Sequence, residues 1–285
     1  MSGGSAGTTV AELRREGRSV LAASPAAADP REATLLLGRV LGLSEAQVLA
    51  RSEQPVERSK REQYRALLAR RARGEPFAYL LGEREFYGRS FGVDPRVLIP
   101  RPETEHLVEV ALASLDRQRA TVLDVGTGSG CIAITLALER PDLLVLASDR
   151  SLDALDVARA NRRRLAADRS VRLLAADLLD GLDPGMIDLV VSNPPYLAPA
   201  DAAQLAIDVR DFEPSDALFA PPDGLAHLRR LIAGAHGLRA GARLILEVGA
   251  NQAAEVAALA GETFEVERIE RDYAGHQRVV SLRRR

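Results

Sequence analysis

The first part of the chain carries apolar residues at helical spacing only. Asp29-Pro30 predicts an N-cap with proline at the first helical position, and Ser44 with Gln47 predicts a capping box for the next helix. Residues 57–73 place their few apolar side chains on one narrow stripe of a charged surface, which is typical of a helix with a single buried face. Residues 1–82 are therefore predicted to form a small all-helical domain.

The pattern changes between residues 83 and 102. From Glu85 to Val93, aromatic and polar residues alternate around two glycines, which predicts a short hairpin. The following Ile99-Pro100-Arg101-Pro102 favours an extended and stiff backbone, because proline fixes its own φ and restricts the residue before it. Residues 83–102 are therefore predicted to be a hairpin and linker between two domains.

From residue 121 onward, short apolar runs rich in β-branched residues alternate with helical patterns. This alternation predicts βαβ units and a doubly wound, mostly parallel sheet. The last two apolar runs have only a loop between them, so they predict an antiparallel hairpin at one edge and a mixed sheet. Arg283-Arg284-Arg285 is predicted to be an unstructured tail. The predicted strands are 121–125, 143–148, 171–174, 187–191, 242–248, 264–270 and 278–282.

Charge and cysteine content exclude some classes of protein. The 38 basic and 40 acidic side chains leave a net charge of −2, which argues against a protein whose main work is stable binding of nucleic acid. The single cysteine, Cys131, excludes an intrachain disulfide and a cysteine-based metal site, and the four histidines have no metal-ligand spacing. The opening MSGGSAGTTV has no apolar core, and no apolar run could span a membrane. We expect a cytoplasmic protein without a metal.

A glycine-rich loop follows the strand predicted at 121–125. Glycines at 126, 128 and 130 let the backbone turn sharply and approach a ligand closely. A dinucleotide fingerprint would require glycine at position 131, where this chain has Cys131. The spacing GxGxG with Asp124 two residues earlier instead resembles the first motif of class I S-adenosylmethionine-dependent methyltransferases.

Two carboxylates stand at the ends of the next two predicted strands. Asp149, roughly 20 residues beyond the glycines, lies where a carboxylate accepts hydrogen bonds from ribose hydroxyls. Asp177 lies where one accepts from an adenine amino group. A lone aspartate at such a position is equally often a helix cap, but three features in register at strand ends indicate a cofactor site for S-adenosylmethionine.

The fourth strand of the sheet runs into Ser192-Asn193-Pro194-Pro195-Tyr196. Two consecutive prolines stiffen the backbone and leave nearby carbonyls without internal partners. The side-chain oxygen of Asn193 and the carbonyl of Pro194 would then grip both N–H bonds of a planar NH2 group and aim its nitrogen at a sulfonium methyl. This motif indicates methylation of an amino nitrogen, but it leaves adenine, guanine and glutamine amides open as acceptors.

Several motifs together resemble the release factor glutamine methyltransferase family. They include Gly82 to Phe86, Leu98 to Glu105, Asp124 to Gly130, Ser192 to Tyr196 and Phe212-Glu213-Pro214, and the likeness covers nearly the whole chain. The resemblance implies a methyltransferase catalytic domain at 103–285 with a class I, Rossmann-like fold. It also implies that the helical domain helps to recognise the protein substrate.

The resemblance further implies roles for individual residues. Asn193, Pro194, Pro195 and Tyr196 would bind the glutamine of the Gly-Gly-Gln motif of class I peptide chain release factors, with Asn193, Pro194 and Tyr196 catalytic. The chain would then act as a monomer in translation termination. A ribosomal protein, or adenine or guanine in nucleic acid, remains an alternative substrate. The implied cofactor-binding residues are Gly126, Thr127, Gly128, Ser129, Gly130, Asp149, Asp177, Leu178 and Asn193.

Overall fold

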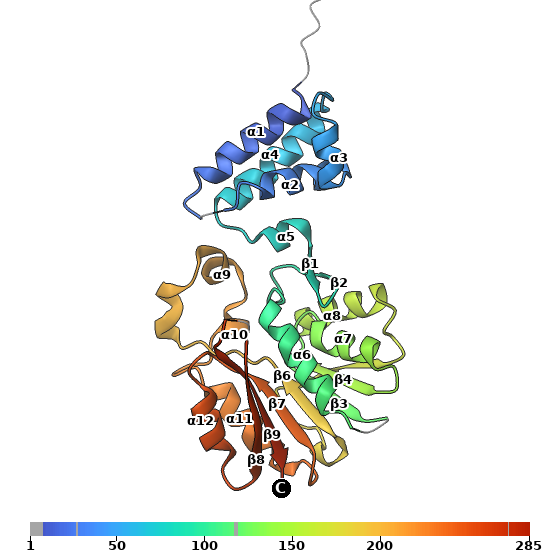
Figure 1. Cartoon of the computed structure of the whole chain (residues 1–285), viewed down its shortest axis with the longest axis vertical. Helices are drawn as coiled ribbons and strands as arrows, with labels where there is room; N and C mark the ends of the chain where they lie inside the picture. The colour runs from blue at the N-terminus through green and yellow to red at the C-terminus, as the bar shows by residue number, and fades with distance from the viewer. Residues whose placement is uncertain (1–7, 27, 117–118, 273) are drawn as a thin grey trace, which may run out of the picture. The chain divides into compact units, whose positions relative to one another are not determined.

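The computed structural model describes residues 8–26, 28–116, 119–272 and 274–285. The chain divides into two compact units (Figure 1). One comprises Met1–Gly82 together with Leu205–Phe212, and the other comprises Glu83–Gln204 and Glu213–Arg285. The limits drawn from the sequence at 82/83 and 102/103 stay predictions, and the segment 83–102 lies inside the second unit.

The first unit is helical and has a core of its own. Tyr64 is fully buried there, and its hydroxyl lies 3.3 Å from the carbonyl oxygen of Leu13 and 3.1 Å from that of Ala33. Leu36 and Leu68 pack in the same apolar cluster. The helices are α1 (Val10–Ala22), α2 (Glu32–Leu41), α3 (Glu45–Ala50), α4 (Arg58–Ala72), α5 (Phe77–Leu81) and α9 (Ile207–Phe212).

The structure confirms one predicted helix start in this unit and moves another. The capping box of α3 is present, because Gln47 N donates to Ser44 Oγ and Ser44 N donates to Gln47 Oε1. The N-cap predicted at Asp29 is wrong, since α2 begins at Glu32. The carboxylate of Asp29 accepts the N–H of Arg31 at 2.8 Å, which closes a local turn before the helix instead of capping it.

The second unit is built on a seven-stranded mixed sheet in the order β5-β4-β3-β6-β7-β9-β8. The first five strands of this order run parallel, and β9 pairs antiparallel with both β7 and β8. The strands are β3 (Thr121–Val125), β4 (Leu144–Asp149), β5 (Val171–Ala175), β6 (Leu189–Ser192), β7 (Arg243–Glu247), β8 (Phe264–Arg271) and β9 (Gln277–Arg284). This arrangement confirms the predicted doubly wound sheet with an antiparallel edge hairpin.

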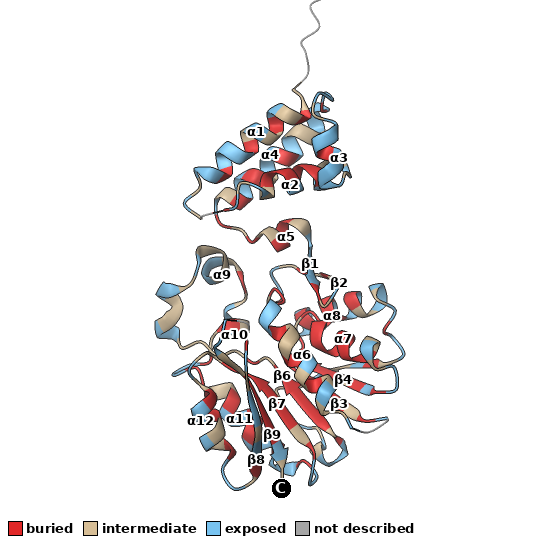
Figure 2. Cartoon of the chain, in the orientation of Figure 1, coloured by how far each residue is buried: buried red, intermediate tan, exposed pale blue. Residues whose placement is uncertain are grey.

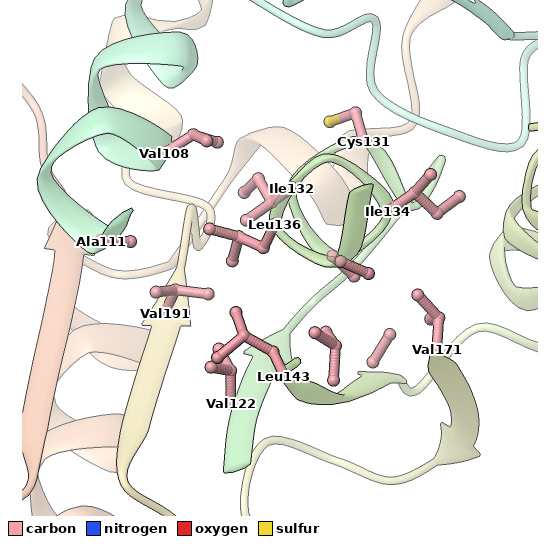
Figure 3. Packing of buried hydrophobic residues seen from close by; sticks show 14 of the residues in the cluster. Val108, Ala111, Val122, Cys131, Ile132, Ile134, Leu136, Leu143, Val171 and Val191 are labelled. Carbon is pink, nitrogen blue, oxygen red and sulfur yellow. The ribbon is translucent and has the colours of Figure 1, made fainter. Parts of the chain in front are cut away.

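Helices cover both faces of this sheet (Figure 1). On one face, Ile132 and Leu136 of α7 and Val108 of α6 point toward Val122 and Val191 of the central strands (Figure 3). Helices α11 and α12 cover the other face, so the central strands are buried on both sides (Figure 2). The α-helices of this unit are α6 (Pro102–Ser114), α7 (Cys131–Glu139), α8 (Leu152–Arg164), α10 (Ser215–Leu218), α11 (Ala226–Gly234) and α12 (Ala253–Ala260).

Shorter elements complete the second unit. Strands β1 (Glu83–Phe86) and β2 (Arg89–Gly92) form the predicted hairpin, with Phe86 opposite Arg89. In the described part of the chain, short 3-10 helices lie at Pro184–Met186, Pro199–Gln204 and Ala235–Gly237.

The arginine-rich end of the chain is not a tail, and that prediction is wrong. Strand β9 continues to Arg284, and Arg283 and Arg284 pair with Glu265 and Phe264 of β8. An edge hairpin can carry charged residues on its solvent-facing side while its backbone is fully paired, so charge alone does not end a strand.

None of the helices in the described part of the chain is long and apolar enough to cross a membrane. The first seven residues of the sequence lie outside the described residues.

Candidate active site

A cavity of about 440 Å³ opens at the carboxyl ends of the parallel strands in the second unit. This is the edge at which open α/β sheets bind ligands. One wall comes from the loops that follow β3, β4, β5 and β6, and the other from Pro95–Leu98 and Pro214–Ala217. The predicted site residues that line the cavity are Gly126, Gly128, Asp149, Asp177, Leu178, Asn193 and Pro195.

Two glycines of the loop after β3 turn their backbone toward open space. Gly126 has φ +72° and Gly128 has φ +54°, and a Cβ built on either would meet no atom within 4 Å. The amides of Gly126 and Thr127 both donate to the Ser148 carbonyl at 2.9 Å, which holds the loop against β4. A ligand can therefore approach the backbone where a side chain would otherwise stand.

Thr127, Ser129 and Gly130 lie on the inner side of the same loop. Thr127 and Ser129 are buried, and the Thr127 hydroxyl donates to Asp124 Oδ2 at 2.6 Å. Gly130 has φ +82°, and a Cβ there would lie 2.9 Å from the side chain of Ile134. These three predicted site residues are not among those that line the cavity. They support the conformation of the loop through contacts inside the protein.

Asp149 ends β4 with its carboxylate held by two backbone amides. Gly128 N donates to Oδ2 and Ser151 N donates to Oδ1, each at 2.9 Å. Each carboxylate oxygen can accept more than one hydrogen bond, so both retain capacity toward the cavity. Asp149 can therefore accept further hydrogen bonds at the cavity that it lines.

Asp177 and Leu178 stand further along the same wall. Asp177 pairs with Arg230 of α11 through an Arg230 Nη2 to Oδ2 distance of 2.9 Å, a partner that the sequence did not indicate. Leu178 has φ +55°, an uncommon conformation for a leucine, and its side chain faces the cavity. An apolar surface beside a carboxylate suits a flat heterocycle that bears an amino group.

Asp124 is fully buried beneath the glycine loop, and burial raises the pKa of its carboxyl from 3.8 to about 7. Between these values the folded protein binds more protons at this group than the unfolded chain does, so stability falls as pH rises. We expect the melting temperature to fall between about pH 5 and about pH 7.5, with a smaller fall in Asp124→Asn. Thermal unfolding measured across this pH range tests the prediction. An equal change of melting temperature with pH in the wild type and in Asp124→Asn would contradict it.

The comparison with the variant separates the effect of Asp124 from those of Glu247, which is buried, and His227, which is partly buried. Burial raises the pKa of Glu247 to about 7, so Glu247 also makes stability fall as pH rises, and it does so equally in the wild type and in the variant. Burial lowers the pKa of His227, which acts in the opposite sense, again equally in both.

The segment after β6 places Asn193 at the cavity. Its Nδ2 donates to Thr104 Oγ1 at 3.0 Å, and its Oδ1 has no partner within the described residues. The Pro194 carbonyl likewise accepts no hydrogen bond from the described part of the chain. Two acceptors from adjacent residues are therefore unused at this point of the sheet edge.

Tyr196 is fixed by its backbone. Gln252 Nε2 donates to the Tyr196 carbonyl at 2.9 Å, and burial raises the pKa of the Tyr196 phenol to about 12. The ring therefore stays neutral at physiological pH. Tyr196 and Pro194 are not among the residues that line the cavity, whereas Asn193 and Pro195 are.

Glu213 connects the two segments of the second wall of the cavity, a role that was not predicted from the sequence. It is almost fully buried and accepts Ile99 N at 3.1 Å and Arg101 Nη2 at 2.5 Å. These bonds join the segment after Pro95–Leu98 to the one before Pro214–Ala217. Both segments belong to the motifs that resemble the methyltransferase family. The presence of a motif in each segment was the sequence signal that could have indicated a contact between them.

Comparisons with known proteins show which families this chain is similar to. Residues 12–82 match the family described as PrmC N-terminal domain, and residues 104–210 match the family described as methyltransferase small domain. A release factor glutamine methyltransferase of Burkholderia pseudomallei is 49% identical over 258 residues, covering 88% of this chain and 87% of the relative. Its counterpart in Nitratidesulfovibrio vulgaris is 41% identical, covering 97% of this chain and 95% of the relative.

Solved structures support the fold. A methyltransferase from Pyrococcus furiosus is 18% identical and superimposes with a TM-score of 0.51, covering 69% of this chain and 89% of that chain. At this level of identity the likeness concerns the fold alone.

Proposed function

Since the chain belongs to the release factor glutamine methyltransferase family, we propose that it methylates the N5 amide nitrogen of the glutamine in the Gly-Gly-Gln motif of class I peptide chain release factors. The methyl donor is S-adenosylmethionine, and the reaction tunes translation termination. The observation that carries this proposal is likeness over both units of the chain, combined with the Asn193 oxygen at the cavity and the adjacent Pro194 carbonyl, which accept no hydrogen bond from the described residues.

The residues that line the cavity fit this cofactor. Gly126 and Gly128 would leave room for its amino acid part, Asp149 would accept hydrogen bonds from its ribose hydroxyls, and Leu178 with Asp177 would contact the adenine. When bound, the cofactor supplies an electrophilic methyl group on a sulfonium. Of the remaining predicted cofactor residues, Thr127, Ser129 and Gly130 would support the loop, and Asn193 lines the cavity.

Asn193 and Pro194 prepare the acceptor nitrogen. An amide nitrogen is a poor nucleophile because its lone pair is delocalised into the carbonyl. Acceptance of its two N–H bonds by Asn193 Oδ1 and the Pro194 carbonyl would orient the lone pair and stabilise the positive charge that develops on nitrogen. Alignment of this kind contributes about 7–11 kcal/mol in well-oriented reactions. No side-chain base is needed until the methyl group has moved.

The helical unit completes the proposal. In this proposal, the helical domain at 1–82 recognises the substrate, 83–102 forms a hairpin and linker, and the domain at 103–285 carries out catalysis. We further propose that the protein acts as a cytoplasmic monomer, with the release factor as its protein partner and without stable binding to nucleic acid.

Transfer of a labelled methyl group from S-adenosylmethionine to purified release factor tests the function. We expect one methyl group on the motif glutamine, located by peptide mass spectrometry, and none on a release factor whose motif glutamine is replaced by alanine. Label that appears instead on a ribosomal protein or on nucleic acid would overturn the substrate and leave the chemistry in place.

A further inference from the structure

A chain of buried polar groups extends behind Asn193, away from the cavity. Asn193 Nδ2 lies 3.0 Å from Thr104 Oγ1, and Thr104 Oγ1 lies 2.7 Å from Glu247 Oε2. Thr104 is 2% exposed and Glu247 is 1% exposed. The three residues come from the loop after β6, the first turn of α6 and the last position of β7. A buried carboxylate with a hydroxyl partner at this place calls for an explanation, because burying an ionisable group is costly.

The number of hydrogens that each group can donate determines the direction of these hydrogen bonds. A threonine hydroxyl has one hydrogen to donate, and an ionised carboxylate can only accept. When Glu247 is ionised, Thr104 must therefore give its hydrogen to Glu247 and present a lone pair to Asn193. Only the NH2 end of the Asn193 amide can meet that lone pair, so Oδ1 is left to face the cavity.

We propose that Thr104 and Glu247 are positioning residues that set the amide orientation of Asn193, so that its oxygen and not its NH2 group faces the substrate. This inference rests on the proposed function, in which Asn193 accepts an N–H of the substrate amide. With the amide reversed, an NH2 group would face another NH2 group, and one of the two acceptors would be lost.

Neighbouring groups shift the pKa of Glu247, the carboxyl group that ends this series of hydrogen bonds. Burial raises the pKa of Glu247 to about 7, while Thr104, Arg278 and Arg101 lower it and Glu103 raises it. A protonated Glu247 could donate to Thr104, which would then donate to Asn193 and favour the reversed amide. The turnover rate should therefore rise with pH through about 7, and this rise should disappear in Glu247→Gln, which has no titrating proton.

A matched set of threonine substitutions tests the relay. Thr104→Val keeps the shape but removes the hydroxyl, and we expect kcat to fall about 10- to 100-fold, less than when a contact to the reacting group itself is deleted. The KM for S-adenosylmethionine should stay near the wild-type value. Thr104→Ser keeps the hydroxyl and should restore most of the activity. Thr135→Val is the control, since Thr135 is fully buried in α7 and its hydroxyl has no partner among the described residues.

A second readout does not depend on the substrate. The chain has three asparagines, so selective 15N-asparagine labelling gives a simple spectrum of side-chain amides. Asn161 donates to the carbonyls of Gly92 and Ser129 and serves as the protected reference, while the exposed Asn251 serves as the fast-exchanging one. We expect the Asn193 amide protons to be protected in the wild type and in Thr104→Ser, and to exchange faster in Thr104→Val.

The outcomes separate the relay from the proposed function. Unchanged protection of Asn193 in Thr104→Val, or equal kcat for Thr104→Val and Thr104→Ser, would overturn the relay. A wild-type pH profile in Glu247→Gln would do the same, and this variant serves if Thr104→Val does not fold. If the wild type methylates no release factor, the proposed function fails, yet the exchange experiment still decides whether Thr104 orients Asn193.

Discussion

Replacing Asn193 with alanine should lower kcat for methyl transfer about 10²- to 10³-fold, the usual effect of removing one preorganised polar contact from a reacting centre. Among the described residues, the Oδ1 atom of Asn193 accepts no hydrogen bond, while its Nδ2 donates to Thr104 Oγ1 at 3.0 Å. The substitution removes an acceptor that acts when charge develops on the substrate nitrogen. It leaves the Pro194 carbonyl and the glycine loop in place.

Steady-state kinetics with release factor as substrate, together with calorimetry of cofactor binding, measure this effect. Affinity for S-adenosylmethionine should change little, because in the proposed reaction the Asn193 oxygen accepts a hydrogen bond from the substrate amide. Asn251→Ala is the matched control, since Asn251 is exposed in the turn before α12. Near-normal turnover in Asn193→Ala would contradict the assigned role.

Replacing Asp149 with alanine should act on the cofactor instead, weakening its binding by about 1–3 kcal/mol. The reason is that a carboxylate hydrogen bond to ribose hydroxyls is charge-assisted and cannot be replaced by alanine. The loss corresponds to roughly 5- to 150-fold in the dissociation constant. Saturating cofactor should restore most of the turnover, which distinguishes this variant from Asn193→Ala.

Calorimetric titration with S-adenosylmethionine or its demethylated product measures the change. Asp149 also accepts the amides of Gly128 and Ser151, so the melting temperature must be followed to separate lost contacts from a disordered loop. Asp168→Ala provides the control, because it removes an equivalent charge from a half-exposed position after α8. Unchanged affinity in Asp149→Ala would remove Asp149 from the cofactor site.

The cavity depends on contacts between segments that lie far apart along the chain. Glu213 joins the Ile99 and Arg101 region to the loop that carries Pro214–Ala217, and Asp216 of that loop pairs at 2.7 Å with Arg150 of the segment after β4. The Arg150–Asp216 pair is exposed and contributes little to stability. Glu213 is different, because its buried carboxylate is satisfied by both a backbone amide and a guanidinium.

Short-range patterns in the sequence were enough to predict the sheet and the line of site residues along its edge. Alternating β-rich and helical runs placed all seven strands of the large sheet close to their observed limits. The glycine loop, Asp149 and Asn193 follow directly after parallel strands, whose carboxyl ends meet at one edge, so their gathering around one cavity was predictable. The capping box of α3 was predictable too, because its hydrogen bonds span three residues.

Tertiary structure alone decided which partner each of these groups received. Thr104 lies 89 positions from Asn193 and 143 positions from Glu247, and the pairing of Asp177 with Arg230 spans 53. No local pattern encodes such pairs, because each partner is chosen by how helices and strands pack. The same limit explains the two local errors: Asp29 could close a turn or cap a helix, and Arg283 and Arg284 could end the chain freely or pair with β8. The sequence shows which polar groups need a hydrogen-bond partner, whereas the packing of helices and strands determines which residue becomes that partner.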